Sequence, residues 1–225
     1  LLKSISQILE FAQIEADQYQ MTTVTVNLNE LIENNLKNIA GRVNPQKITL
    51  KRNIPSETVF VSADEQNLNN VIDILLNNAV KFTNQGFVEI ELTTLEDRNL
   101  AICKVKDTGV GISGDYLEHI FLPFSQEDLK IGRNYEGNGL GLALAKRYIE
   151  KMEGSLLIDS IKGVGSTFTF TLPIAVNPDA KEESNVIIKK KRILIIDEYR
   201  ESFTLLDAFL KSNYHLTFSD MSSID

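Results

Sequence analysis

Three glycines alternate with larger residues from Gly137 to Leu142, which reads GNGLGL and runs directly into the helical pattern LALAKRYIEKM. Glycine lacks the side chain that would keep a ligand away from the backbone, and the first turn of a helix presents unpaired N–H groups and a positive dipole end. Phosphate binding by Gly137, Gly139, Leu140 and Gly141 is the chemistry that this spacing favours. A plain glycine-rich turn before a helix is the other interpretation of the stretch alone.

A second polar set lies in the segment NNAVKFT, where Asn78 and Lys81 fall on one face of a predicted helix together with Asn70 and Ile74. The amide oxygen of Asn78 can ligate a hard cation, and the Lys81 ammonium can reach phosphate oxygens. The ordinary polar side of an amphipathic helix would show the same pattern.

Asp107 ends an apolar strand pattern and is followed by TGVG, with Gly109 and Gly111. A carboxylate at a strand end can accept a hydrogen bond from the exocyclic amine of a purine, and glycines let the backbone lie against a flat ring. A simple Asp-Thr-Gly turn is the alternative. Arg133, in the polar segment SQEDLKIGRNYEGN, is a natural bidentate phosphate partner, although an exposed loop arginine often has no such role.

The elements that position these residues alternate in blocks of helices and antiparallel strands, which predicts an α+β fold, a two-layer α/β sandwich of one sheet against helices. Helical periods run through 28–39, from Asp64 to about Phe82, and onward from Gly141, with Asp64 as an N-cap and Phe82 on the buried side. The strand patterns are ITLKRNI, TVFVSA, FVEIELTTL, NLAICKVK, SLLIDSI and GSTFTFTLPI, the last two forming a hairpin.

Both ends of the chain carry further patterns. Ile5, Leu9, Ala12, Ala16 and Tyr19 recur at steps of four and three, which predicts a coiled-coil-like helix that needs a partner. Near the other end, RILIID reads as an apolar strand and ESFTLLDAFLKSN as an amphipathic helix, the opening of a parallel α/β domain.

Composition narrows the function classes. The 225 residues are 43% hydrophobic, with a net charge of −8, so a general nucleic-acid-binding surface is excluded and any phosphate site must be local. The single cysteine, Cys103, cannot form an internal disulfide and is expected in the core. One cysteine and two distant histidines do not support zinc chemistry.

In chain order, the segments NNAVKFT, DTGVGI, IFLPFSQ, RNYEGNGLGLALAKRYIEKMEG and KGVGSTFTFTLP resemble the catalytic and ATP-binding domain of sensor histidine kinases. LLKSISQILEFAQIEADQYQM resembles the second helix of that family's dimerisation and phosphotransfer bundle, and KRILIIDEYRESFTLLDAFL resembles the start of a flavodoxin-like receiver domain. The resemblance implies a hybrid kinase with a bundle helix over 1–22, a catalytic domain over 23–176, a linker over 177–191 and part of a receiver over 192–225.

The resemblance also implies the ligands, ATP and Mg²⁺, and the transfer of the γ-phosphoryl group to a histidine on a helix outside this chain. Asn78 would ligate Mg²⁺ with help from Lys81, and Asp107 would recognise adenine in a slot shaped by Gly109 and Gly111. The remaining implied roles are phosphate binding by Arg133, Gly137, Gly139, Leu140 and Gly141, support of the purine by Thr167, and Mg²⁺ binding in the receiver by Asp197 and Glu198.

The implied partners are the phosphoacceptor helix of the same kinase, a receiver domain or response regulator, and a second copy in a homodimer. The resemblance places the chain in the cytoplasmic part of a sensor protein. It implies no direct contact with nucleic acid.

Two residues depart from the family pattern. Ile74 stands four residues before Asn78, where these kinases commonly carry a polar residue, and Asn138 stands where threonine or serine is usual. Gyrase-like and mismatch-repair ATPases carry a general base at the position of Ile74, so isoleucine counts against ATP hydrolysis. A catalytically degenerate nucleotide-binding scaffold, or a regulator of a response regulator, stays open for the same reason.

Overall fold

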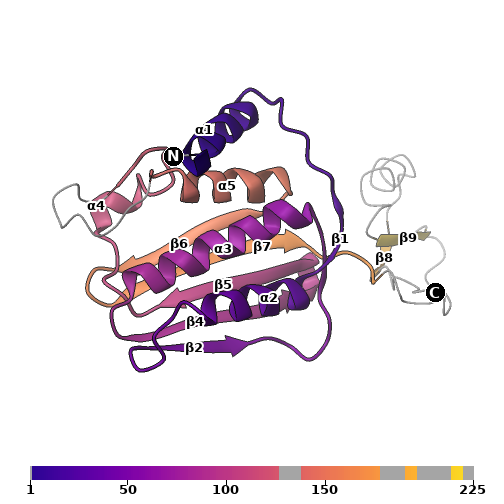
Figure 1. The fold of residues 1–225 in the computed structure, drawn as a ribbon. Helices are drawn as coiled ribbons and strands as arrows, with labels where there is room; N and C mark the ends of the chain where they lie inside the picture. Colours follow the sequence, from indigo (N-terminus) through magenta and orange to yellow (C-terminus); the bar gives the residue numbers. More distant parts are fainter. Residues whose placement is uncertain (1, 127–137, 178–190, 197–213, 220–225) are drawn as a thin grey trace. The chain divides into compact units, whose positions relative to one another are not determined.

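The computed structural model describes residues 2–126, 138–177, 191–196 and 214–219 (Figure 1). The chain divides into one compact unit over Leu1–Asp179 and a second over Ala180–Asp225. The predictions for Arg133, Gly137, Asp197 and Glu198 lie outside the described residues. Among the described helices, none combines the length and the apolar character that a bilayer span requires.

A five-stranded sheet forms one layer of the first unit, in the order β2, β4, β5, β7, β6. These strands are β2 (Ile48–Asn53), β4 (Gly86–Leu95), β5 (Leu100–Asp107), β7 (Gly165–Pro173) and β6 (Ser155–Ile161). The pairs β4–β5, β5–β7 and β6–β7 are antiparallel as predicted, but β2 runs parallel to β4. The antiparallel prediction is wrong at this edge, because a helix between β2 and β4 lets the chain cross over and return in the same direction.

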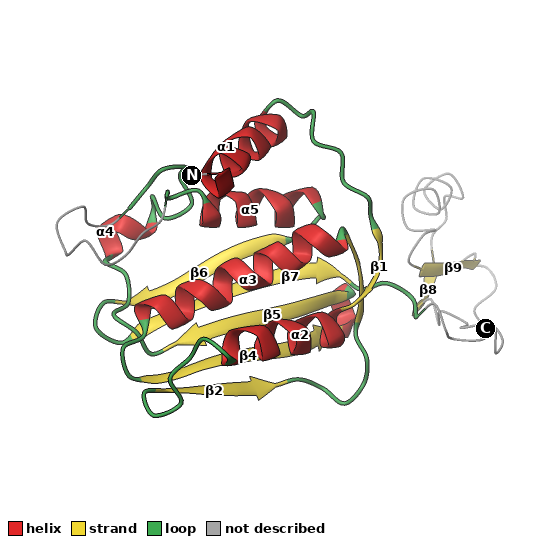
Figure 2. Ribbon diagram, viewed as in Figure 1, coloured by secondary structure: helices red, strands yellow, loops and turns green. Residues whose placement is uncertain are grey.

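Helices cover one face of this sheet (Figure 2). They are α2 (Leu28–Ala40), α3 (Glu65–Phe82) and α5 (Gly141–Lys151), and a single turn, α4 (Gly114–Leu117), follows β5. Asp64 caps α3 as predicted, since its Oδ1 accepts a hydrogen bond of 3.0 Å from the Asn67 N–H. Asn27 caps α2 through the Glu30 N–H at 3.1 Å. The prediction of a two-layer α/β sandwich is confirmed.

The core lies between the two layers and includes Cys103, whose side chain is fully buried as expected. Burial raises the pKa of this thiol far above its ordinary value, so Cys103 is a packing residue. Its largest fully buried companions are Tyr148, Phe170, Leu28, Ile32, Leu68, Ile72, Leu75, Leu76, Ile90, Leu92, Leu140 and Leu144.

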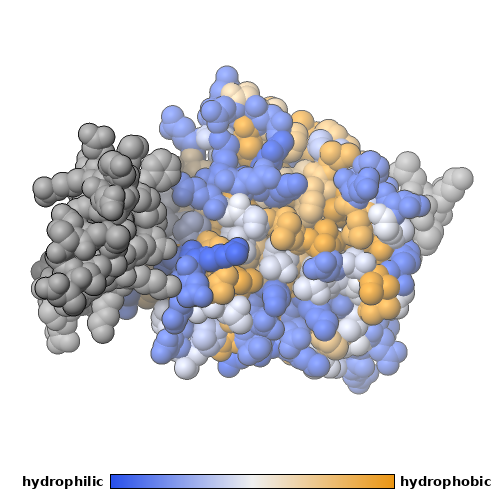
Figure 3. Space-filling view, turned by 180° about the vertical axis from the view of Figure 1, so that it is seen from behind, coloured by the Kyte–Doolittle hydropathy of each residue, from blue (hydrophilic) through white to orange (hydrophobic). Residues whose placement is uncertain are grey.

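None of the described helices covers the other face of the sheet, and hydrophilic and hydrophobic residues are interspersed there (Figure 3). The strand register aligns Lys51, Glu89 and Lys106 across β2, β4 and β5. Lys51 Nζ lies 3.8 Å from the centroid of the Phe87 ring. Opposite charges thus stand beside one another on this face, and Lys104 Nζ of β5 lies 3.4 Å from Glu91 Oε1 of β4.

The first helix, α1 (Leu2–Glu15), ends earlier than the heptad pattern through Tyr19 predicts. Asp17 adopts a left-handed conformation (φ 54°), the Asp17 N–H donates to Ile14 O at 3.1 Å, and the Gln18 N–H donates to Gln13 O at 2.9 Å. These two bonds around a left-handed residue form a Schellman motif, which stops the helix.

A small antiparallel pair, β1 (Val24–Asn27) and β3 (Phe60–Ala63), connects α1 to the sandwich. The TVFVSA pattern predicted β3. The strand β1 was not predicted, because no turn residues mark the boundary between it and the segment after α1.

The second unit contains two described strands, β8 (Lys191–Ile196) and β9 (Tyr214–Ser219), which pair in parallel. Parallel pairing requires a crossover connection, as in a β-α-β unit. The predicted helix ESFTLLDAFLKSN lies outside the described residues, and the assignment to a receiver domain stays a prediction.

Candidate functional site

The helix α3 presents two chemically different sides. Leu68, Ile72 and Leu75 are buried against the sheet, and the side of Asn78 and Lys81 is only partly buried. Burial lowers the pKa of Lys81 from its ordinary value. Phe82, predicted on the buried side, is instead 38% exposed, because it is the last residue of α3. Lys81 Nζ lies 5.1 Å from the centroid of its ring.

The polar side of α3 meets the beginning of α5. A Cβ placed on Gly141 would lie 3.5 Å from Cγ2 of Ile74, which is ordinary van der Waals contact. The structure therefore brings the helix that carries Asn78 and Lys81 beside the glycine-rich turn. Ile74 is an apolar surface at this junction and offers no proton acceptor.

Gly139 requires glycine for two separate reasons. Its φ of 69° is left-handed, and a Cβ there would lie 2.8 Å from the backbone carbon of Phe124. The Phe124 N–H donates to Gly139 O at 3.0 Å, which joins the two described ends of the segment around 127–137. Leu140, predicted to bind a ligand, has its side chain fully buried in the core, so only its backbone can serve that role.

Asp107 lies at the end of β5 with its carboxylate largely buried. Its Oδ1 accepts hydrogen bonds from the N–H groups of Gly109 at 2.8 Å and Ser166 at 3.3 Å. Burial raises the pKa of Asp107, and the two backbone donors oppose that shift. Since both donors reach Oδ1, Oδ2 is the oxygen available for another donor.

Gly109 and Gly111 allow backbone segments to approach closely. A Cβ on Gly109 would lie 2.3 Å from Phe82 O, and one on Gly111, at φ 61°, would lie 2.0 Å from Ile161 O. The loop after Asp107 is thereby packed between the end of α3 and the β6–β7 hairpin. A cavity of about 420 Å³ adjoins this loop, and its lining residues are Asn84, Gln85, Thr108, Gly109, Val110, Lys162 and Gly163.

Thr167 is not brought together with Asp107. In the register of β5, β7 and β6 it stands opposite Lys106 and Asp159, and neighbouring residues of a strand point to opposite faces of the sheet. Ser166 is the residue on the side of Asp107. The sequence analysis missed it, although the alternation through Phe168, Phe170 and Leu172 places Ser166 on the same inward face.

Ser166 also belongs to a hydroxyl network. Its Oγ lies 2.9 Å from Ser160 Oγ, and Ser160 Oγ accepts a hydrogen bond from the Ile112 N–H at 2.8 Å. These bonds tie the hairpin to the loop after Asp107, so they fix the position of the Asp107 carboxylate.

The described residues contain no cluster of three or more His, Cys, Asp or Glu side chains that could hold a metal ion. Mg²⁺ can bind a protein through few side chains when phosphate oxygens and water supply its other ligands.

Comparison with known proteins gives one family match. The family described as Histidine kinase-, DNA gyrase B-, and HSP90-like ATPase matches residues 63–176. Every described residue of the candidate site lies within that range.

Two curated relatives are similar over most of this chain. Sensor protein GacS of Pseudomonas syringae pv. syringae is 33% identical over 205 residues, which cover 88% of this chain and 22% of GacS. Sensor histidine kinase RcsC of Escherichia coli (strain K12) is 35% identical over 175 residues, which cover 77% of this chain and 18% of RcsC. The chain thus spans less than a quarter of the length of these relatives.

Solved structures share the fold. Full-length ShkA in complex with AMPPNP has a TM-score of 0.69 at 23% identity, covering 99% of this chain and 46% of ShkA. The mycobacterial sensor histidine kinase MprB has a TM-score of 0.57 at 25% identity, covering 68% of this chain and 98% of the MprB chain.

Proposed function

Because the chain belongs to the Histidine kinase-, DNA gyrase B-, and HSP90-like ATPase family and carries the ATP-binding catalytic domain of a hybrid sensor histidine kinase, we propose that it donates the γ-phosphoryl group of ATP to a histidine outside this chain. One observation carries the proposal: α3 meets the start of α5 at Ile74 and Gly141. This contact sets the positive end of α5 beside the helix with Asn78 and Lys81, a combination suited to a triphosphate.

The adenine end of the nucleotide would lie at Asp107. Oδ2 of this carboxylate would accept a hydrogen bond from the exocyclic amine, while the N–H groups of Gly109 and Ser166 hold Oδ1 in place. The Ser160–Ser166 hydroxyl pair supports this geometry at 2.9 Å. In this proposal Ser166 takes the supporting role that the family resemblance suggested for Thr167.

The phosphate end would lie between α3 and the glycine-rich turn. Asn78 would offer its amide oxygen to Mg²⁺, and Lys81 and the N–H groups at the start of α5 would bind phosphate oxygens. Mg²⁺, when bound, neutralises phosphate charge. The neutral amide oxygen of Asn78 fits such an ion, since phosphate oxygens and water would supply its other ligands.

The transfer forms a bond between an imidazole nitrogen of the acceptor and Pγ, and it breaks the bond from Pγ to the oxygen that bridges to Pβ. The bridging oxygen keeps the electron pair and leaves as part of ADP. This chain contributes by positioning the nucleotide and neutralising its charge.

Ile74 is consistent with a histidine acceptor. Neutral imidazole attacks with its own lone pair, whereas water needs a general base to become an effective nucleophile. An isoleucine at the junction of α3 and α5 therefore disfavours a clamp-type ATPase more than it disfavours a kinase. A scaffold without catalysis would bind nucleotide and transfer nothing, so transfer assays separate it from the kinase.

The proposal also includes the protein partners, which are a second copy of the kinase and a receiver domain or response regulator. Ile5 and Leu9 of α1 are 48% and 60% exposed, which suits a helix that pairs with the other helices of a dimeric bundle. A receiver domain or response regulator would then take the phosphoryl group from the histidine.

Calorimetric titration with AMPPNP tests the nucleotide site directly. We expect binding that weakens when Mg²⁺ is chelated, and a roughly 10-fold or greater loss of affinity in Asn78→Ala, since a hydrogen-bonding group for a charged ligand is lost. Asn34→Ala, on the exposed side of α2, is the matched control and should bind like the wild type. Equal affinity with and without Mg²⁺ would count against the assignment of Asn78.

A further inference from the structure

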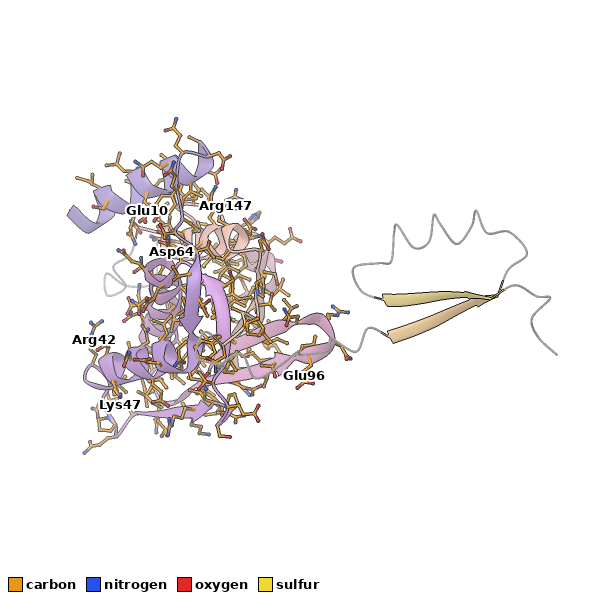
Figure 4. The ribbon with its side chains drawn as sticks, turned by 90° about the vertical axis from the view of Figure 1, so that its right-hand side faces the viewer. Glu10, Arg42, Lys47, Asp64, Glu96 and Arg147 are labelled. Carbon is orange, nitrogen blue, oxygen red and sulfur yellow. The ribbon has the colours of Figure 1, made fainter. Side chains whose placement is uncertain are left out.

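Polar contacts hold the helix α1 against the rest of its unit. Figure 4 labels two of the residues involved, Glu10 on α1 and Arg147 on α5. At the C-terminal end of α1, Arg147 Nε lies 2.7 Å from Glu15 Oε1, and Lys151 Nζ lies 2.6 Å from Asp17 Oδ1. Both cations belong to α5. Exposed ion pairs such as these contribute little individually, but they fix which side of α1 faces α5.

The middle of α1 is anchored by Glu10. Its Oε1 accepts a hydrogen bond from the Tyr19 hydroxyl at 3.1 Å, and the Tyr148 hydroxyl bonds the same carboxylate. Burial and this neighbouring carboxylate raise the pKa of Tyr148, so the hydroxyl stays a donor. Ile14, only 5% exposed, packs into the core below. Docking of α1 is therefore both apolar and polar.

The N-terminal part of α1 reaches the glycine-rich turn itself. Asn138 Nδ2 donates to Gln7 Oε1 at 2.8 Å, and Asn138 Oδ1 accepts a hydrogen bond from the Leu140 N–H at 3.2 Å. The two bonds use opposite ends of one amide. Gln7 thus fixes the orientation in which the Asn138 oxygen covers the Leu140 N–H.

The Leu140 N–H stands immediately before the first turn of α5, where unpaired donors make an anion site. A phosphate oxygen that accepts this N–H must displace Asn138 Oδ1. Rotation of the Asn138 amide also breaks its bond to Gln7, because the amide is planar and its two ends move together.

We propose that the Gln7–Asn138–Leu140 chain of hydrogen bonds is an autoinhibitory contact, in which docked α1 lowers the affinity of the glycine-rich turn for the phosphates of ATP. The inference rests on the proposed function for the identity of the ligand. By linkage, nucleotide binding weakens the docking of α1 by the same factor, so any movement of α1 is transmitted to the nucleotide site.

The test is a calorimetric titration of the 225-residue chain with AMPPNP and Mg²⁺. Gln7→Ala removes the acceptor for Asn138 and is expected to tighten binding roughly 3- to 10-fold, the range set by one net hydrogen bond. Gln7→Glu keeps an acceptor and should bind no more tightly than the wild type. Gln13→Ala, at an exposed position of the same helix, is the matched control and should leave affinity unchanged.

Unchanged or weaker binding by Gln7→Ala would overturn the proposal, since it would mean that the contact is neutral or supports the site. Hydrogen exchange of the Leu140 amide without nucleotide gives an independent readout. Faster exchange in Gln7→Ala, with no change in Gln13→Ala, is expected. If no variant bound AMPPNP, the proposed function and the inhibitory role would both fail, while the exchange rates would still decide whether the hydrogen-bond chain exists.

Discussion

At the scale of single residues, Asp107 is a position where the requirements of folding stability and of ligand binding differ. Burial raises the pKa of Asp107, so the folded state binds the proton more tightly than the unfolded chain does. In the unfolded chain an aspartate carboxyl titrates at about 3.9. Stability from this group is therefore greatest at low pH and falls as the pH rises through the interval between the two pKa values. Ionising this buried carboxylate is therefore less favourable in the folded state than in the unfolded chain.

The substitution Asp107→Asn tests this separation. An asparagine oxygen can still accept the Gly109 and Ser166 N–H groups, so we expect no loss of unfolding free energy at pH 7 and a roughly 10-fold or greater loss of nucleotide affinity. Urea denaturation and AMPPNP titration measure the two effects. The stability of the variant relative to the wild type should decline as the pH is lowered towards 4. A rise instead would reverse the sign of the pKa shift assigned to Asp107.

Gly139 gives a second prediction at this scale. Gly139→Ala combines a left-handed φ of 69° with a Cβ 2.8 Å from the backbone of Phe124, so it should destabilise the unit by about 1–3 kcal/mol and weaken nucleotide binding. Gly114→Ala is the control, because a Cβ there meets no atom within 4 Å. Thermal unfolding and AMPPNP titration of both variants check this, and equal behaviour of the two would refute the close approach at Gly139.

At the scale of elements, α3 carries both the core and the site. Leu68 is fully buried at its N-terminal end, away from Asn78 and Lys81. Leu68→Ala should lower the unfolding free energy by about 2–5 kcal/mol through the cavity it leaves. The exposed Leu157 of β6 offers a control, since Leu157→Ala should cost no more than about 0.5 kcal/mol. Similar losses in chemical denaturation would contradict the assigned layers.

The sequence predicted the elements whose periods are long and whose ends carry a marked residue. The cap at Asp64, the apolar period of α3 and the glycines around Gly139 were all readable because each depends on neighbours along the chain. The parallel pairing of β2 was not readable, because strand partners depend on distant contacts. The end of α1 was not readable either, because Asp17 adopts a left-handed conformation without being a glycine.

The candidate site likewise combines residues that the sequence could predict with contacts that it could not. Asn78, Lys81 and Asp107 stand in recognisable motifs, and their roles stay predictions that the variants above test. Ser166 could have been found from strand alternation, whereas the bond between Gln7 and Asn138 could not, because it joins residues 131 positions apart.

At the scale of the whole molecule, the described helices α2, α3 and α5 of the sandwich gather on one face of the sheet (Figure 1). The net charge of −8 opposes an anionic ligand, so affinity must come from the local donors of α3 and α5. In the proposed function this chain holds the donor half of a phosphoryl transfer. The central claim is that ATP bound here is used to phosphorylate a histidine.

Transfer of label from γ-labelled ATP tests that claim most directly, in a protein that carries this chain together with the preceding bundle helix and its histidine. We predict acid-labile, base-stable label on that histidine, lost in Asn78→Ala and retained in Asn34→Ala. Free phosphate without labelled protein, or nucleotide binding with neither product, would contradict the account.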